Sequence, residues 1–179
     1  MKLRWPVTAL FTLLALCCTQ IADGKQSREN EQTTFSAEES RVNKPVAIPP
    51  DVLSVLSRDK IVSDVLESEK IQAKQIPASW FSASTIHLGN SREVDLIVMS
   101  VGPVHGANAT MFWAFRPTAL GHELLFAGGG HTLRVKNKRW KGFREIETLS
   151  VVMQQVSTVL YRFDGKRYIR YKDNLEDIQ

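Results

Sequence analysis

The segment Val159–Lys172 (VLYRFDGKRYIRYK) contains two short runs of β-branched and aromatic residues on either side of the dipeptide Asp164-Gly165. Such runs are typical of strands, because branched and aromatic side chains pack well on a pleated surface. An Asp-Gly pair between two strands favours a type I′ turn, in which both central residues have positive φ. The segment therefore predicts an antiparallel hairpin with strands at residues 159–163 and 167–172.

The residues that precede this hairpin repeat the same pattern. From Pro77 onward, Gly, Asn and Pro divide short apolar runs at intervals of about 8 to 12 residues, as in all-β proteins. The glycine run at 128–130 is expected to be a flexible turn. The further strands are expected near residues 80–88, 95–101, 111–116, 122–127, 132–136 and 143–149.

Residues 51–70 have a different periodicity, with apolar side chains grouped on one helical face after Pro49-Pro50. They predict one helix, or two short helices in which Asp59 is the second N-cap. The predicted fold class is therefore α+β, mainly β. We expect an antiparallel meander sheet or small sandwich of about seven to eight strands, with one N-terminal helix packed on it.

The start of the chain has the layout of an export signal. Met1-Lys2-Leu3-Arg4 carries two positive charges, and the apolar run Val7–Cys18 follows it. This run is too short for a permanent transmembrane helix, which needs roughly 18 to 20 apolar residues. We predict a signal peptide over residues 1–22, cut between residues 19 and 24, and a mature protein that is periplasmic or secreted.

Both cysteines of the 179-residue chain, Cys17 and Cys18, lie in this segment, so the mature protein would form no disulfide. The alternative is a bacterial lipoprotein acylated at Cys17, although Leu16 stands where Gly, Ala or Ser is normally required. The polar residues 23–50 predict a disordered tether. We expect a single globular domain over 51–172, with its helix at 51–70 and its β-rich part at 78–172, and a tail at 173–179.

The segment Ile86–Val98 (IHLGNSREVDLIV) and the blocks at 106–116, 141–146 and 161–168 form an ordered series. The series resembles small exported bacterial proteins related to FG-GAP, integrin-type propeller repeats, over about residues 80–171. The resemblance implies a fold and no reaction, because the family is mostly without an assigned function.

The loop that holds Ca²⁺ in such repeats uses carboxylates at alternate positions. Here His87, Gly89 and Ser91 occupy polar positions of that pattern and only Asp95 is retained. We therefore predict no Ca²⁺ site, and a capping or structural hydrogen bond for Asp95.

Other candidates for chemistry are few. The histidines lack the i, i+4 spacing of a helical metal site, and no serine lies in a nucleophile elbow. Glu145 and Glu147 share one strand face and are the paired carboxylates that a glycan hydrolase would need. We expect no enzyme, no catalytic residue, no metal and no cofactor, and a hydrolase that uses Glu145, Glu147 or a histidine stays as an alternative. The four histidines are His87, His105, His122 and His131.

Charge is unevenly distributed along the chain, whose formal net charge is +4. Residues 23–70 carry seven basic and ten acidic side chains, whereas residues 131–172 carry eleven basic and three acidic ones. Alternate residues of a strand share a face, so this excess predicts a basic face near the C-terminus. Its candidate binding residues are Arg139, Trp140, Lys141, Arg162, Lys166 and Arg167.

These observations predict an exported, non-enzymatic accessory or binding protein of the cell envelope. Its expected partner is an anionic envelope component or an acidic protein, and not a nucleic acid. The alternative is an exported immunity protein or hydrolase inhibitor. Lysozymes are usually basic, so a basic inhibitor surface would repel them, and this counts against the alternative. A basic face also has a simpler explanation, because charged edges keep exposed strands from aggregating.

Overall fold

The computed structural model describes residues 31–90, 92–106 and 109–177. Two α-helices, α2 Pro50–Leu56 and α3 Lys60–Ser68, precede most of the strands, and three short 3-10 turns lie at Ala73–Gln75, Ala78–Trp80 and Gly102–Val104. The strands formed by the described residues are β1 Thr34–Ser36, β2 Phe81–Ile86, β3 Asp95–Ser100, β4 Thr110–Thr118, β5 Gly121–Gly130, β6 Thr132–Trp140, β7 Phe143–Val152, β8 Gln155–Phe163 and β9 Tyr168–Asp177.

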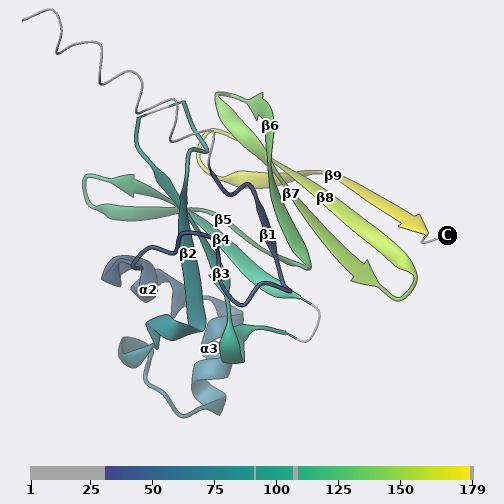
Figure 1. Cartoon of the computed structure of the whole chain (residues 1–179). Helices are drawn as coiled ribbons and strands as arrows, with labels where there is room; N and C mark the ends of the chain where they lie inside the picture. Colours follow the sequence, from purple (N-terminus) through teal and green to yellow (C-terminus); the bar gives the residue numbers. More distant parts are fainter. Residues whose placement is uncertain (1–30, 91, 107–108, 178–179) are drawn as a thin grey trace, which may run out of the picture. The chain divides into compact units, whose positions relative to one another are not determined.

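The strands form two antiparallel sheets (Figure 1). One sheet has the order β2-β3-β4-β5 and the other has the order β1-β6-β7-β8-β9, so every pairing except β1 with β6 joins consecutive strands. The predicted α+β, mainly β class with a meander of strands is confirmed. Each strand expected between residues 80 and 172 corresponds to an observed strand, and several extend further than predicted.

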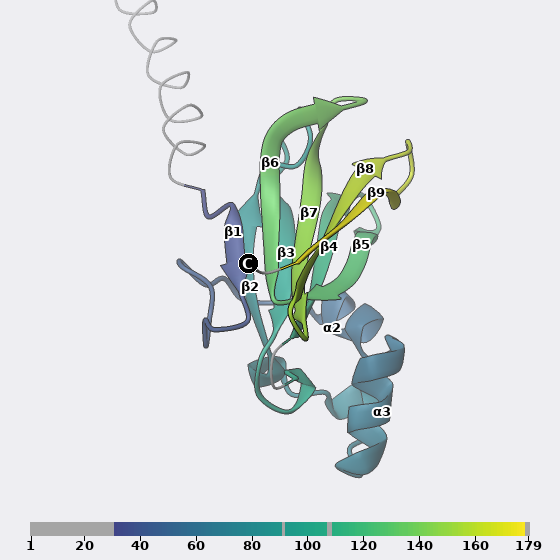
Figure 2. The same ribbon diagram turned by 90° about the vertical axis from the view of Figure 1, so that its right-hand side faces the viewer.

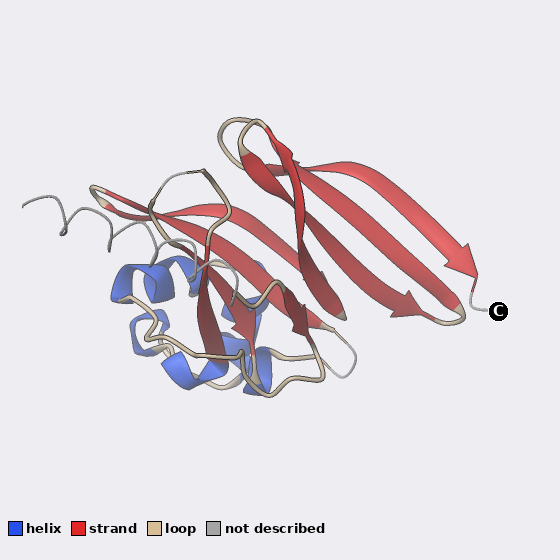
Figure 3. Cartoon of the chain, turned by 45° about the horizontal axis from the view of Figure 1, so that its top comes forward, coloured by secondary structure: helices blue, strands red, loops and turns tan. Residues whose placement is uncertain are grey.

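The four-stranded sheet lies between the helices and the five-stranded sheet (Figure 3), and its strand β3 is buried on both faces. On β3, Leu96 and Val98 pack with the helix residues Val52 and Leu56. The alternate residues Ile97 and Met99 belong instead to a second cluster with Leu133 and Ile146 of the other sheet. Because successive side chains of a strand point to opposite faces, an apolar run such as DLIVMS supplies both clusters.

The expected helix at 51–70 is two helices, as the alternative prediction allowed. Asp59 lies between them, and its Oδ1 accepts the backbone N–H of Ile61 at 3.0 Å, which makes it the N-cap of α3. Its second oxygen, Oδ2, accepts the indole N–H of Trp113 on β4 at 3.0 Å. One carboxylate therefore starts α3 and fixes it to the four-stranded sheet.

The expected tether at 23–50 is wrong for its second half. Thr34–Ser36 pairs with β6, and the Phe35 side chain is completely buried in the cluster between the sheets. Further along, Val42 is also buried, and Val46 forms an antiparallel bridge with Ala83. Phe35 and Val42 are isolated apolar residues in a polar segment, so they do not form the periodic pattern of a strand or helix. Each of them is nevertheless buried in the core.

The expected tail at 173–179 is also corrected, because β9 continues through Asp177 with regular pairing to β8. The predicted signal peptide and the lipidation candidate Cys17 lie outside the described residues. No helix in the described part of the chain is long and apolar enough to cross a membrane.

The two-residue type I′ turn expected at Asp164-Gly165 is absent there. Asp164 accepts the backbone N–H groups of Lys166 and Arg167 on its own carboxylate, and the turn spans four residues. The geometry of a type I′ turn occurs instead between β6 and β7, where Lys141 and Gly142 have φ of 48° and 80°. The side-chain hydrogen bonds of Asp164 stabilise a different local backbone conformation, which replaces the type I′ turn at this position.

The glycine run at 128–130 is part of β5 and not a flexible turn. A Cβ atom on Gly128 would lie 2.6 Å from the Phe126 ring, and one on Gly130 would lie 2.9 Å from the carbonyl oxygen of Leu149. Gly128 therefore leaves room for a ring of its own strand, and Gly130 allows β5 to approach β7 of the other sheet.

The far ends of β7, β8 and β9 extend beyond the four-stranded sheet (Figures 1 and 2). The apolar side chains of this part of the sheet are exposed, and Met153 at its turn is 95% exposed. The others are Val151, Val152 and Leu175.

Candidate binding site

Three of the six predicted site residues come together in one hollow of about 310 Å³ at the surface of the five-stranded sheet. Trp140 ends β6, Lys141 follows it in the turn, and Arg162 lies on β8. The remaining lining residues come from the end of β8, the next turn and β9: Phe163, Asp164, Ile169 and Tyr171. We call this site the aromatic hollow.

Arg162 is held in place by partners on three sides. Its Nε donates to Oε1 of Glu145 at 2.5 Å, and its guanidinium lies 4.7 Å from the Trp140 ring centroid and 3.5 Å from that of Tyr171. The hydrogen bond to Glu145 raises the pKa of Arg162, so the guanidinium stays charged. The buried Glu145 carboxylate neutralises the charge of Arg162. The main role of Arg162 is therefore to hold the Trp140 and Tyr171 rings in place, not to attract an anion.

Lys141 links two hairpins at the edge of the aromatic hollow. Its Nζ donates to the carbonyl oxygen of Asp164 at 2.6 Å, and its charge is among the causes that lower the pKa of the Asp164 carboxyl. Lys166 and Arg167 follow Asp164 and are exposed, and neither forms an ion pair with another described residue. Their N–H groups lower the pKa of Asp164, with the hydrogen bond from Arg167 as the largest contribution.

Arg139 lies outside the aromatic hollow. Its Nη1 donates to the carbonyl oxygens of Leu88 and Gly142, at 3.0 Å each, and ties the β6–β7 turn to the loop after β2. The predicted basic face therefore contains one structural arginine, Arg139, one arginine neutralised by Glu145, and three cations that lie beyond ion-pair distance of any described carboxylate: Lys141, Lys166 and Arg167.

The prediction missed Ile169 and Tyr171, which are 45% and 56% exposed. Both are apolar residues in a strand that is otherwise mostly charged, and this contrast is a sequence signal that could have identified them. A β-bulge lies at this point of β9, because Leu160 pairs with Lys172 while Tyr161 pairs with Arg170. The extra residue is Tyr171, which faces Arg162.

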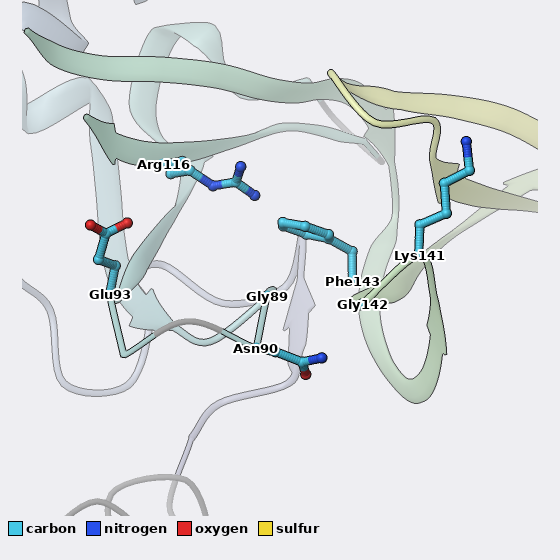
Figure 4. Close-up of a pocket in the computed structure, with 7 residues that line it drawn as sticks. All are labelled: Gly89, Asn90, Glu93, Arg116, Lys141, Gly142 and Phe143. Carbon is cyan, nitrogen blue, oxygen red and sulfur yellow. The ribbon is translucent and has the colours of Figure 1, made fainter. Parts of the chain in front are cut away.

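A second hollow of about 320 Å³ lies on the other side of the β6–β7 turn (Figure 4). Arg116 of β4 points across it toward Phe143, with 4.3 Å between the guanidinium and the ring centroid. Its Nη2 is buried and has no hydrogen-bond partner among the described residues. The other lining residues are Gly89, Asn90, Glu93, Lys141 and Gly142.

Asp95, the residue retained from the repeat pattern, closes the loop between β2 and β3. Its Oδ2 accepts the backbone N–H of Leu88 at 2.9 Å, and its Oδ1 lies 3.7 Å from Nε of Arg116. Burial raises its pKa. The predicted structural hydrogen bond of Asp95 is confirmed.

The other candidates for chemistry lie apart from one another. His122 contacts Asp51 at 2.9 Å and His131 lies 3.6 Å from Glu38. Across the residues that the structure describes, no three His, Cys, Asp or Glu side chains converge as metal ligands would.

Glu145 and Glu147, the paired carboxylates, each face cations. Glu145 pairs with Arg162, and Glu147 contacts Lys136 at 3.2 Å and Arg134 at 3.7 Å. Both carboxylates therefore form ion pairs within the five-stranded sheet, which gives each of them a structural role.

Comparisons with models of protein families, with curated proteins and with solved structures found no match to this chain. The resemblance to FG-GAP-related exported proteins therefore stays a prediction.

Proposed function

We propose that this chain is an exported, non-catalytic binding protein of the cell envelope that holds an acidic glycan in the aromatic hollow. The observation that supports this most directly is that two half-exposed rings, Trp140 and Tyr171, line the same hollow as the cation Lys141. Aromatic rings present a flat apolar face with a polar edge, which suits the C–H face of a sugar ring. A cation beside the rings suits a carboxylate or phosphate substituent on that sugar.

The electrostatics of the surrounding surface support an anionic ligand. Residues 131–172 carry eight more basic than acidic side chains. At the aromatic hollow Arg162 and Glu145 cancel, and the three cations Lys141, Lys166 and Arg167 outnumber the one remaining carboxylate, Asp164. A concave site lined by one sign of charge attracts ligands of the opposite sign and does so less at high salt.

The hollow also has the general features of a small-ligand site. Its volume of about 310 Å³ falls in the range of ligand pockets, which are mostly apolar with a few placed polar groups. Arg162 fixes both rings before any ligand arrives, so little ordering of side chains is needed on binding.

The test is a titration with an oligogalacturonate, an acidic sugar chain, against its methyl-esterified form, which has the same rings without the charge. We expect the acid form to change the tryptophan fluorescence, because Trp80 and Trp113 are buried while Trp140 is 45% exposed. Trp140→Ala should abolish the signal and weaken binding, and Lys141→Ala should weaken binding roughly tenfold.

Lys138→Ala is the matched control, because Lys138 is an exposed cation of the same strand that does not line the aromatic hollow. Equal affinity for the acid and the ester, or equal losses in Lys141→Ala and Lys138→Ala, would contradict a charge-selective site.

Export has its own test. Intact-mass measurement of protein recovered from the envelope of a bacterial host should give a chain that begins between residues 20 and 25. A mass that includes an acylated Cys17 would instead show a lipoprotein, and an intact Met1 would contradict export.

A further inference from the structure

Strand β9 forms one edge of the five-stranded sheet, next to β8. All of its ten residues except Tyr168 are exposed, and no described strand pairs with its other side. A long free edge presents unpaired backbone N–H and C=O groups that can pair with another strand.

The charges of β9 are ordered along the strand. Arg170 and Lys172 lie in its first half, and Asp173, Glu176 and Asp177 lie in its second half. Arg170 pairs with Asp173, whereas Lys172 forms no ion pair with a described residue. When two identical strands pair antiparallel, the first half of each lies opposite the second half of the other, so this order is self-complementary.

The register of β9 selects one such arrangement. Pairing with Leu160, Thr158 and Val156 of β8 places Lys172, Asn174 and Glu176 on a single face. An antiparallel pair centred on Asn174 puts Lys172 opposite the partner's Glu176, and Glu176 opposite the partner's Lys172. The bulge at Tyr171 lies outside this stretch, which is regular from Lys172 to Asp177.

We propose that β9 binds the β9 strand of a second copy of this chain about a two-fold axis at Asn174, so that the two five-stranded sheets become continuous. Lys172 and Glu176 then form two symmetric cross-strand ion pairs. Such oppositely charged pairs favour the antiparallel register, and like charges at the same positions oppose it.

A charge swap tests this interface, with protein expressed from the full-length sequence and its mass in solution measured by sedimentation equilibrium. We expect the unmodified protein to be a dimer. Lys172→Glu and Glu176→Lys should each weaken the dimer roughly tenfold or more, and the double variant should regain the affinity of the parent. A monomeric parent protein, or a double variant no stronger than the single variants, would overturn the proposal.

Cysteine cross-linking tests the register separately. In a chain with Cys17→Ser and Cys18→Ser, Asn174→Cys places two thiols opposite each other at the axis. Mild oxidation should join this variant into a dimer much faster than Val152→Cys, a 57% exposed control at the end of β7. Equal rates for the two variants would contradict the axis at Asn174.

The proposal is independent of the ligand assigned to the aromatic hollow. Glu176 does not line that hollow and lies outside the basic segment 131–172, so Glu176→Lys should bind the oligogalacturonate no more weakly than the parent protein does if both proposals hold. The Trp140→Ala variant should in turn remain a dimer.

Discussion

Strands β3 and β9 are opposite extremes of the same fold. All six residues of β3 are buried, whereas nine of the ten residues of β9 are exposed. Strand β3 lies in the middle layer and packs on both faces, while β9 forms an edge and carries aromatic and charged side chains at the surface. The contrast separates the part of the chain that determines stability from the part available for binding, and each prediction below tests that separation.

The largest effect is expected at a second edge strand, β1, which breaks the simple rule that edges are exposed. Phe35→Ala should lower the free energy of unfolding by about 3–5 kcal/mol, because the ring is completely buried between the sheets. Urea denaturation would measure it. A loss below about 1 kcal/mol would mean that residues near 35 are a tether after all.

The next largest effect compares the two strands directly. Ile97→Ala on β3 should cost about 2–5 kcal/mol, since Ile97 is fully buried. Leu175→Ala on β9, where the side chain is 59% exposed, should change the free energy of unfolding by about 0.5 kcal/mol or less when measured in dilute protein. Similar losses at the two sites would remove the distinction between the buried layer and the exposed edge.

A smaller effect is expected where the helices join the middle layer. Asp59→Ala removes the N-cap of α3 and leaves the Trp113 indole N–H without its acceptor, which should cost about 2 kcal/mol in denaturant unfolding. Asp64→Ala is the control, because the Asp64–Lys60 ion pair is exposed and worth about 0.5 kcal/mol or less. Equal costs would contradict the double role of Asp59.

The smallest effect concerns Tyr168, the one buried residue of β9. Its hydroxyl donates to the carbonyl oxygen of Arg144 at 2.7 Å, and burial raises its pKa, with a smaller contribution from Asp95. Tyr168→Phe should cost about 1 kcal/mol at neutral pH.

The same residue predicts a pH dependence. Because the pKa of Tyr168 is raised in the folded state, the unfolded chain loses the hydroxyl proton at a lower pH than the folded protein does. The contribution of Tyr168 to the free energy of unfolding is therefore fully present below about pH 10, the ordinary tyrosine pKa, and is lost as the pH rises above it. Denaturant titrations at several alkaline pH values should show a shallower decline for Tyr168→Phe than for the parent protein. Identical slopes would contradict a buried hydroxyl.

The sequence predicted most of β2 to β9 because their apolar residues follow the period of a strand or fill both faces of one. It failed for β1, where Phe35 alone carries the burial signal and a polar neighbourhood hides it. It failed also for the type I′ turn predicted at Asp164-Gly165. The Asp164 carboxylate accepts two local backbone N–H groups there, and the preference of Asp-Gly for a type I′ turn does not take such hydrogen bonds into account.

For the candidate binding site, charge counting pointed to the part of the surface where the aromatic hollow lies but not to the role of each residue. It could not distinguish Arg162, which is neutralised by a buried glutamate, from Lys141, which is not. That distinction depends on which side chains lie opposite one another across β7 and β8, and therefore on register. Tyr171 was missed for the same reason, because a bulge and not simple alternation determines its direction.

The pairing of β1 with β6 has a consequence for the order of folding. Every other strand pairing joins neighbours along the chain, whereas Phe35 and Leu133 are roughly a hundred residues apart, and closing so long a loop carries a large entropic cost. The consecutive hairpins can therefore form before this closure, and we expect β1 to dock last. The core between the sheets then stays open at one end until a segment near the N-terminus closes it, so the rate of this last step would determine how long the partly folded chain exposes apolar surface.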